Sequence, residues 1–439
     1  APIVILPFLV LYLFFNFREL KIDLVYKIFL IYLLAQLPQY FYLDSVNLYD
    51  VYWIICGLSV ITYFIIIQNE NIELNNFVFN IFIIIIFFLA LKFTFNLLYD
   101  YISNYYSHPA ARVNFYGFDT MAPNTVFFDQ PVPRSSGLSR MIMIVWLGIF
   151  AIYIFSNTKN IIKNFFLIFI LIILSSLLFH LQSRLIFLFQ IALILFILIV
   201  PIYKLNLYKK FSLILFFFLI PYLIHVAEPQ VRNYLQQEKA LQLANSKLNQ
   251  NELEIKQKTT EEFEKKGLVN GSNLVNGSNI EDPQNKDSET ELENLKVQLG
   301  KERITHMHST GRLNMWKKTI KLVLENNLLG FGPQADRKIL EQNVSGLIFY
   351  ALICGGIISF LSIVFIIIFI SIKLFKHIFI NKIFLNSKNI YFGFSIFIIG
   401  LLFVRAIGEI TFGLFGIDMI LFFVSYNIIS KFENVSKNI

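Results

Sequence analysis

Three arginines stand at or beside short polar connections between strongly apolar stretches of the sequence. They are Arg184, Arg312 and Arg405. A guanidinium group near the apolar part of a bilayer costs free energy unless an anion compensates its charge, and its planar array of donors suits a phosphate. These residues therefore predict a site for a phosphate-bearing ligand, provided that the three connections lie on the same side of the protein.

Two carboxylates could belong to the same site. Glu409 follows Arg405 by four residues, a spacing at which Arg and Glu form a structural ion pair more often than Glu acts as a catalytic base. Asp418 lies in a later apolar stretch, where an acid either packs against polar groups inside a helix bundle or takes part in the site. Glu409 is retained as a candidate catalytic residue, and Asp418 stays open between the two interpretations.

Three histidines lie near the arginines in the sequence. His306 and His308 precede Arg312, and His180 stands four residues before Arg184. An imidazole can serve as a general base, although a histidine near lipid headgroups is more often simply interfacial. His306 and His308 have no third ligand at a fixed spacing, so the sequence does not predict a metal site.

The composition places the chain among membrane proteins. Hydrophobic residues make up 56% of the 439 residues, 49 residues are Phe, and the mean hydropathy is +0.63. Uncharged runs such as 81–91 and 165–178 are typical of membrane-spanning helices. The lysines behind the formal charge of +8 gather in short connections, which follows the positive-inside rule and argues against nucleic acid as a partner.

We expect an all-α polytopic membrane protein with about eleven visible spans. The apolar segments lie at 2–17, 24–43, 51–67, 77–98, 141–155, 161–179, 185–203, 211–227, 347–372, 390–404 and 410–429. Lysine-rich connections alternate with the others, so they are assigned to the cytoplasm. Counting back places Ala1 outside, and we therefore expect a twelfth span before it in the full protein.

This topology puts the arginines on one outer face. The outward connections contain all three of them, and lie at 99–140, 180–184, 228–346 and 405–409. In a Gram-negative cell that face is the periplasm, which has no ATP. A reaction there would need an activated substrate delivered by the membrane.

The chain divides into three parts. These are an N-terminal membrane bundle at 1–227 with its outer segment at 99–140, a long outer loop at 228–346, and the last membrane helices at 347–439. Within the loop, residues 232–302 are polar and contain the hexapeptide LVNGSN twice in tandem, which indicates a spacer without a catalytic role. Residues 304–345 carry the motifs.

The motif-bearing part predicts an amphipathic helix followed by a tight turn. Ser309 or Thr310 can cap this helix, whose apolar side chains fall on one face and whose lysines fall on another. The apolar residues are Leu313, Trp316, Ile320, Val323 and Leu324, and the basic ones are Lys317, Lys318 and Lys321. We expect the helix to lie across the spans at the membrane surface, and Gly330 and Gly332 to allow close backbone approach in the turn.

At these motifs the sequence resembles the O-antigen polymerase and ligase superfamily of bacterial envelope polysaccharide enzymes. The resemblance rests on Ser-Thr-Gly-Arg at 309–312 followed by Trp316, on Glu-Asn-Asn-Leu-Leu-Gly-Phe-Gly-Pro at 325–333, and on the Ser-Arg pair at 183–184. The segment at 134–140 is similar to an earlier outer segment of the family. Together with many spans and a long late loop, these motifs extend the resemblance over most of the architecture.

The resemblance implies a glycosyltransferase of the bacterial inner membrane with its active site facing the periplasm. Its substrate would be an oligosaccharide linked to undecaprenyl pyrophosphate, without nucleotide sugar, metal or other cofactor, and its further partners a membrane lipid, a chain-length regulator and a flippase. The candidate catalytic residues are Arg184, Arg312, Arg405, Glu409 and His308, and the candidate substrate-binding residues are Arg134, Arg140, His180, Trp316, Gly330, Gly332 and Arg337. The three candidate catalytic arginines would neutralise the departing pyrophosphate.

Several functions stay open. Ligases of this family carry a His-Asn pair before the span that follows the long loop, whereas residues 342–346 here read Gln-Asn-Val-Ser-Gly. This difference favours a repeat-unit polymerase, with polysaccharide ligase as the alternative. A transporter of a lipid-linked or anionic substrate would show internal repeats and paired Gly- or Pro-broken spans, and neither is evident. A receptor or anchor, in which the arginines are incidental, is a further alternative.

Overall fold

The fold is known from a computed structural model in which the regular elements of the described residues are all helices. The described residues are 7–12, 15, 22–37, 48–69, 72–103, 135–155, 160–181, 183–200, 207–224, 226–227, 234, 312–340, 344–380 and 389–437. Arg134, His306, His308 and the repeated hexapeptide lie outside these residues, and of His180 only the backbone is described.

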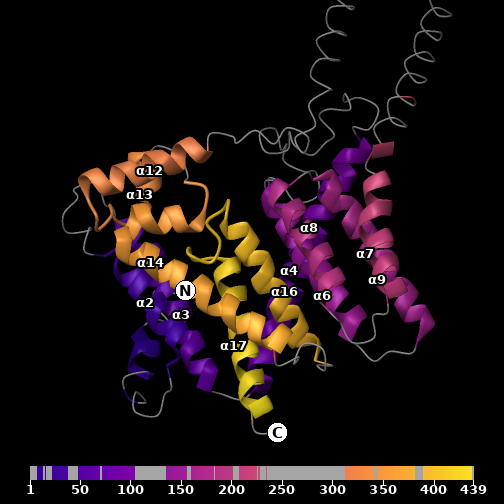
Figure 1. The fold of residues 1–439 in the computed structure, drawn as a ribbon, viewed down its shortest axis with the longest axis horizontal. Helices are drawn as coiled ribbons and strands as arrows, with labels where there is room; N and C mark the ends of the chain where they lie inside the picture. Colours follow the sequence, from indigo (N-terminus) through magenta and orange to yellow (C-terminus); the bar gives the residue numbers. More distant parts are fainter. Residues whose placement is uncertain are drawn as a thin grey trace, which may run out of the picture.

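Most of the helices follow the predicted apolar segments in order, and α12 and α13 lie in the predicted outer loop (Figure 1). The helices are α2 Leu24–Leu34, α3 Leu48–Asn69, α4 Ile72–Ser103, α6 Ser135–Phe155, α7 Ile161–His180, α8 Arg184–Ile199, α9 Leu207–Ile214 with a π-helical continuation Leu215–Leu219, α12 Arg312–Asn326, α13 Ala335–Ile339, α14 Leu347–Phe375 with a π-helical continuation Lys376–Ile380, α16 Ile390–Ala406 and α17 Ile417–Lys437.

Several of these helices are long and apolar enough to cross a membrane. Within the described part of the chain, four meet both criteria, at Val51–Gln68, Gly137–Phe155, Ile162–Phe179 and Leu347–Ile380. Shorter apolar helices lie at Leu24–Leu34, Asn76–Lys92, Arg184–Ile199, Lys210–Ile224 and Ile390–Ala406. The described part of the chain is therefore all-helical and of the membrane class, and the count of eleven spans stays a prediction.

The outward surface also fits a membrane protein. On α7, Phe165 and Phe166 are 71% and 61% exposed, and Ile162 on the same helix is 80% exposed. Aromatic and aliphatic side chains in this number on one outward face are disfavoured in water but not in lipid. The face of α7 that turns away from the bundle is therefore suited to the bilayer.

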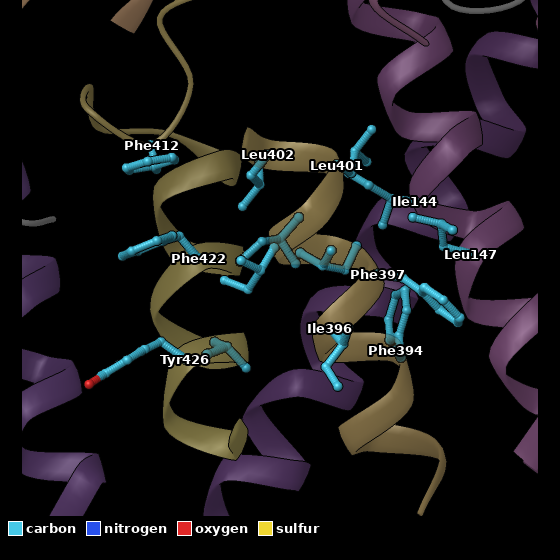
Figure 2. Close-up of a cluster of buried hydrophobic side chains, with 14 of the residues drawn as sticks. Ile144, Leu147, Phe394, Ile396, Phe397, Leu401, Leu402, Phe412, Phe422 and Tyr426 are labelled. Atoms are coloured by element: carbon cyan, nitrogen blue, oxygen red, sulfur yellow. The ribbon is translucent and has the colours of Figure 1, made fainter. Parts of the chain in front are cut away.

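The core lies where α16 packs between α6 and α17. Figure 2 shows Leu147 of α6 beside Phe394 and Phe397 of α16, and Phe422 of α17 beneath Phe412. The rings of Phe412 and Phe422 stack with centroids 4.4 Å apart. Because Phe412 lies in the connection between α16 and α17, this stacking anchors that connection to the core.

The connection between α16 and α17 is longer than the sequence predicted. We expected the last span to begin at residue 410, but α17 begins at Ile417. The Tyr32 hydroxyl of α2 donates a hydrogen bond of 2.7 Å to the Gly413 carbonyl, which occupies a backbone acceptor outside any helix. The glycines Gly408, Gly413 and Gly416 favour a turn over a helix, and the residues between the two helices form the corner described below.

Helix α14 is broken in its first half. Gly355 and Gly356 have non-helical backbone angles, with φ +62° at Gly356. The turn at 328–332 docks there: the Phe331 N–H donates to the Ile353 carbonyl at 2.8 Å, the Gly332 N–H donates to the Cys354 carbonyl at 2.8 Å, and the Ile357 N–H donates to the Leu328 carbonyl at 3.0 Å. The turn thus satisfies backbone groups that the break releases, as buried backbone requires.

Candidate arginine site

The predicted site residues come from helix ends. Arg184 and Arg312 are the first residues of α8 and α12, and Arg405 is the last residue but one of α16. Arg140 lies in the second turn of α6, and Asp418 is the second residue of α17. The contacts described next bring these ends together on one side of the bundle.

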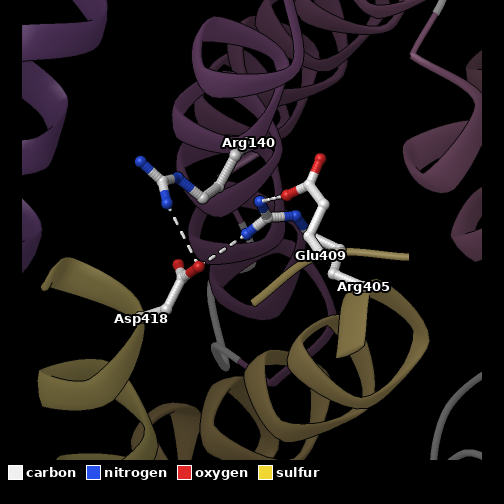
Figure 3. Close-up of polar contacts among 4 residues, drawn as sticks. All are labelled: Arg140, Arg405, Glu409 and Asp418. Carbon is white, nitrogen blue, oxygen red and sulfur yellow. Dashed lines mark hydrogen bonds and ion pairs between the residues drawn. The ribbon is translucent and has the colours of Figure 1, made fainter. Parts of the chain in front are cut away.

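Asp418 joins two arginines from different helices through a single oxygen atom. Its Oδ2 accepts a hydrogen bond from Arg140 Nη1 at 3.1 Å and another from Arg405 Nη1 at 2.8 Å. Arg405 also donates from Nη2 to Oε2 of Glu409. Figure 3 shows the four side chains as one continuous network. We call Arg140, Arg405, Glu409 and Asp418 the ion-pair network.

Burial strengthens the attraction between the charges of the ion-pair network, but it also removes the water that would otherwise solvate them. The side chain of Arg405 is 3% exposed and that of Asp418 is 5% exposed, whereas Arg140 and Glu409 are 23% and 25% exposed. Each buried charge has lost its water and depends on its partner. Removing one partner would therefore leave an uncompensated charge in a place that water does not reach.

The ion-pair network engages Arg405, one of the candidate catalytic residues. Sequence reasoning assigned it to the phosphate, but both of its Nη atoms donate to carboxylates of the chain itself. Its predicted pairing with Glu409 is present in the structure. Arg405 is thus placed to hold the corner after α16 in a fixed shape, with Asp418 as its buried partner.

The guanidinium of Arg312 reaches the same corner. A Cβ atom added to Gly408 would stand 2.6 Å from Arg312 Nη1 and 3.0 Å from Cδ2 of Leu185, the residue after Arg184. Gly408 itself lies between Arg405 and Glu409 in the chain. The starts of α8 and α12 therefore meet the end of α16 at one glycine, which has no side chain to keep the guanidinium away.

The charges at this corner do not cancel. In the ion-pair network two guanidinium groups face two carboxylates, so the network is neutral. Arg312 adds a positive charge and, among the residues that the structure describes, makes no ion pair. A positive charge beside a neutral network is suited to an anion such as a phosphate.

Trp316 seats α12 on the start of α14. Its ring stacks on that of Phe349 with centroids 4.6 Å apart and planes 14° apart, and its indole N–H donates to the Ser345 carbonyl. Sequence reasoning placed Trp316 among the substrate-binding residues but also considered that it packs the helix. The described contacts are packing contacts.

The candidate substrate-binding glycines also pack. Gly330 has φ +84°, and a Cβ there would stand 2.4 Å from the backbone nitrogen of Gly356; the amide of Gly332 is one of the donors to α14. Both positions need glycine because the turn and the broken helix approach each other backbone to backbone. Arg337, the remaining candidate in this region, is exposed on α13.

Asp336 is a buried acid that sequence reasoning missed. It is 1% exposed, and its Oδ2 accepts from the Val344 backbone N–H at 3.1 Å, while its Oδ1 has no partner among the described residues. Burial raises the pKa of this carboxyl group above its ordinary value, and the bond from Val344 opposes that shift. In the sequence, an acid beside Arg337 in a polar turn is indistinguishable from a solvated one.

The Asp336 carboxylate holds the segment that leads into α14 through its bond from Val344. Gly346, two residues after Val344, has φ +110°, and a Cβ there would stand 2.9 Å from the Ile407 carbonyl. The segment before α14 therefore lies against the corner that follows α16. Asp336 and the corner at 407–409 are linked through this segment.

For the remaining candidate site residues, the structure does not test the predicted roles. Arg134 and His308 lie outside the described residues, as does the side chain of His180. In the described part of the chain, no three side chains of His, Cys, Asp or Glu form a group that could hold a metal ion.

No family model matches this sequence, and neither a curated protein nor a solved structure matches it.

Proposed function

We propose that this chain is a membrane glycosyltransferase of the O-antigen polymerase type. It would join oligosaccharide repeat units carried on undecaprenyl pyrophosphate at the periplasmic face of the bacterial inner membrane. The sequence motifs suggest the substrate class. The observation that carries the proposal is the position of the Arg312 guanidinium against Gly408, beside the neutral ion-pair network.

In the proposed glycosyl transfer, the leaving diphosphate must be stabilised without a metal ion. A hydroxyl of the acceptor sugar attacks the anomeric carbon, the bond from that carbon to the pyrophosphate oxygen breaks, and its electron pair stays on the pyrophosphate. Arg312 and Arg184 would donate hydrogen bonds to the oxygens on which charge accumulates. Losing one such donor would cost about 3–4 kcal/mol of transition-state stabilisation.

Arg405 acts in this proposal as a positioning residue. Its guanidinium is already engaged by Glu409 and Asp418, so it holds the corner against which Arg312 rests. The structural contacts favour this role over direct phosphate binding, because both Nη atoms of Arg405 already donate to carboxylates. Arg140 shares Asp418 and supports the same arrangement from α6.

The proton of the attacking hydroxyl needs an acceptor, for which Glu409 and His308 are the two candidates. The Glu409 side chain is 25% exposed and that of Asp418 is 5% exposed. Glu409 is thus the carboxylate of the ion-pair network that a substrate can reach. His308 stands four residues before Arg312 in the sequence, and an imidazole there would suit the same task.

One observation favours a transporter as the second candidate. Transporters use broken helices whose freed ends bind ions or substrates, and α14 is broken at Gly355 and Gly356. Here, however, backbone groups beside the break bond to the turn at 328–332. The break is occupied by the chain itself, so it supports a fixed attachment of that turn better than a substrate site.

The test is the profile of surface and lipid-linked polysaccharide from a strain that lacks this gene. The strain is complemented with the wild type, Arg312→Ala, Arg312→Lys or Lys318→Ala, the last being an exposed cation on the same helix. We expect single repeat units without the gene, a ladder with the wild type and Lys318→Ala, and no ladder with either Arg312 variant. Arg312→Lys fails because an ammonium group cannot make the planar paired contacts.

Other outcomes separate the alternatives. Long chains that stay on the lipid carrier in the deletion strain indicate a ligase. An unchanged profile in that strain argues against both enzymes and leaves transport, another substrate, or a receptor or anchor. A ladder restored by Arg312→Ala would show that this arginine does not hold the pyrophosphate.

A further inference from the structure

The apolar face of helix α12 is buried along one edge and exposed along the other. Thr319 and Val323 are fully buried, and Trp316 stacks on α14. Leu313 and Leu324, by contrast, are 50% and 59% exposed. We call Leu313, Ile320 and Leu324 the outer stripe. At 100° per residue these three side chains lie within roughly 40° of one another around the helix.

The outer stripe continues into the turn and is bordered by cations. Leu328 and Leu329 are 50% and 53% exposed. Lys317 and Lys321, which project just beside the stripe by the same helical spacing, are both exposed. The ion pair of Lys321 with Glu325 spans 4.0 Å between two well-exposed side chains, so it holds that lysine only weakly.

The helix lies at the ends of the apolar helices. Its first residue touches Gly408, just past the end of α16, and Trp316 stacks on Phe349 at the start of α14. Figure 1 shows α12 at the upper left, above α14 and α2. If the apolar helices span a bilayer, their ends lie at its polar surface, and α12 lies at the same level.

We propose that the outer stripe of α12 inserts into the headgroup region of an anionic phospholipid bilayer, with Lys317 and Lys321 on lipid phosphates. A helix with exposed aliphatic side chains and flanking lysines binds such a surface by both burial and charge. The exposed leucines then need no protein partner. This proposal is independent of glycosyl transfer, because it concerns only the depth of α12.

The depth of α12 can be measured on the full chain in lipid nanodiscs. A nitroxide label is attached at Leu324→Cys in the outer stripe or, as a matched control, at Asn314→Cys on the polar face of the same helix. The native Cys56 and Cys354 are both buried, so labelling is selective for the introduced site. Collisions with oxygen, which concentrates in lipid, are compared with collisions with a water-soluble nickel complex.

We expect the Leu324→Cys label to collide more with oxygen than with nickel, and the Asn314→Cys label to do the reverse. Adding Lys317→Gln and Lys321→Gln should reduce the contrast in discs that contain phosphatidylglycerol and leave it unchanged in pure phosphatidylcholine. Nickel contact at both labels overturns the proposal because the stripe then faces water. Protection of the Leu324→Cys label from both reagents also overturns it, because another segment or a protein then covers the stripe.

Discussion

The guanidinium of Arg312 rests directly on the backbone of Gly408. A Cβ atom at Gly408 would lie 2.6 Å from Arg312 Nη1, closer than non-bonded atoms tolerate. The two residues are far apart in the sequence, yet the guanidinium of Arg312 can occupy its position only because Gly408 has no side chain. The site can therefore be perturbed without changing any charged residue.

Gly408→Ala should strongly reduce polymer formation and leave the fold intact. The new methyl group meets the ends of two side chains, Arg312 and Leu185, so both can move aside at little cost in folding free energy. A displacement of about 1 Å in a positioning group can lower a rate by about 100-fold. The measurement is the polysaccharide ladder, together with thermal unfolding of the purified variant in detergent.

Gly400→Ala is the matched control for Gly408→Ala. It lies inside α16, where a Cβ meets Phe189 at an ordinary 3.7 Å, and it should retain the ladder. A full ladder with Gly408→Ala would contradict the assignment of Arg312 to the pyrophosphate.

Removing Asp418 should destabilise the protein strongly. Asp418→Ala leaves the guanidinium of Arg405, whose side chain is 3% exposed, with only Glu409 as a partner. Breaking a buried ion pair in this way costs about 3–5 kcal/mol. Double-mutant cycles by thermal unfolding should give a larger coupling free energy for Asp418 with Arg405 than with the more exposed Arg140.

A control for that cycle is the exposed pair of Lys321 and Glu325 on α12. Their coupling should be below what the measurement detects, because solvent screens exposed charges. If Asp418 coupled equally weakly to both arginines, the ion-pair network would not be what holds the corner in place.

Much of the fold could be predicted from the sequence. The limits predicted for the span at 161–179 agree with α7 to within one residue, because the apolar run is unbroken and the side chain of Asn160 caps the start of the helix. The break in α14 could not be predicted. A Gly-Gly pair in an apolar run is compatible with a continuous helix, and only the turn docked against it from 328–332 selects the broken form.

The site was predictable in its residue types but not in its pairings. Arg405 and Glu409 are four residues apart, and the Glu409 N–H donates to the Arg405 carbonyl at 2.8 Å, so the turn after α16 keeps the spacing that pairs their side chains. The bond from Arg140 to Asp418 joins residues in different helices and depends on how α6 packs against its neighbours. Asp336 was missed because its burial comes from the segment before α14, which no local pattern reveals.

Gly330→Ala should loosen the attachment of α12 to the bundle. Its Cβ would stand 2.4 Å from a backbone nitrogen of Gly356, which cannot move aside, and its φ of +84° disfavours any side chain. The left-handed conformation costs about 1–2 kcal/mol, and each backbone hydrogen bond lost from the turn costs about 1 kcal/mol more. Thermal unfolding should show this loss, and the ladder should disappear with it.

The control for Gly330→Ala is Gly416→Ala, where a Cβ meets nothing within 4 Å. It should behave as the wild type in both measurements. Wild-type stability in Gly330→Ala would mean that the turn at 328–332 is not anchored to the break in α14.

The stability of the protein should depend on pH through Asp336. Burial raises the pKa of this carboxyl group in the folded protein, while in the unfolded chain it keeps its ordinary value. Between the two pKa values the folded state binds more protons than the unfolded state, so stability falls as pH rises through that window. At neutral pH the ionised Asp336 therefore lowers the free energy of unfolding.

Asp336→Asn should raise the unfolding temperature at neutral pH, because the amide oxygen still accepts from the Val344 N–H and no charge is buried. Its advantage over the wild type should shrink as pH falls towards the ordinary carboxyl pKa. Asp336→Ala, which lacks the acceptor, should be less stable than Asp336→Asn at every pH by about 1–3 kcal/mol, the cost of an unsatisfied buried donor. A wild type more stable than Asp336→Asn at neutral pH would reverse the sign and show that the folded protein stabilises the ionised carboxylate.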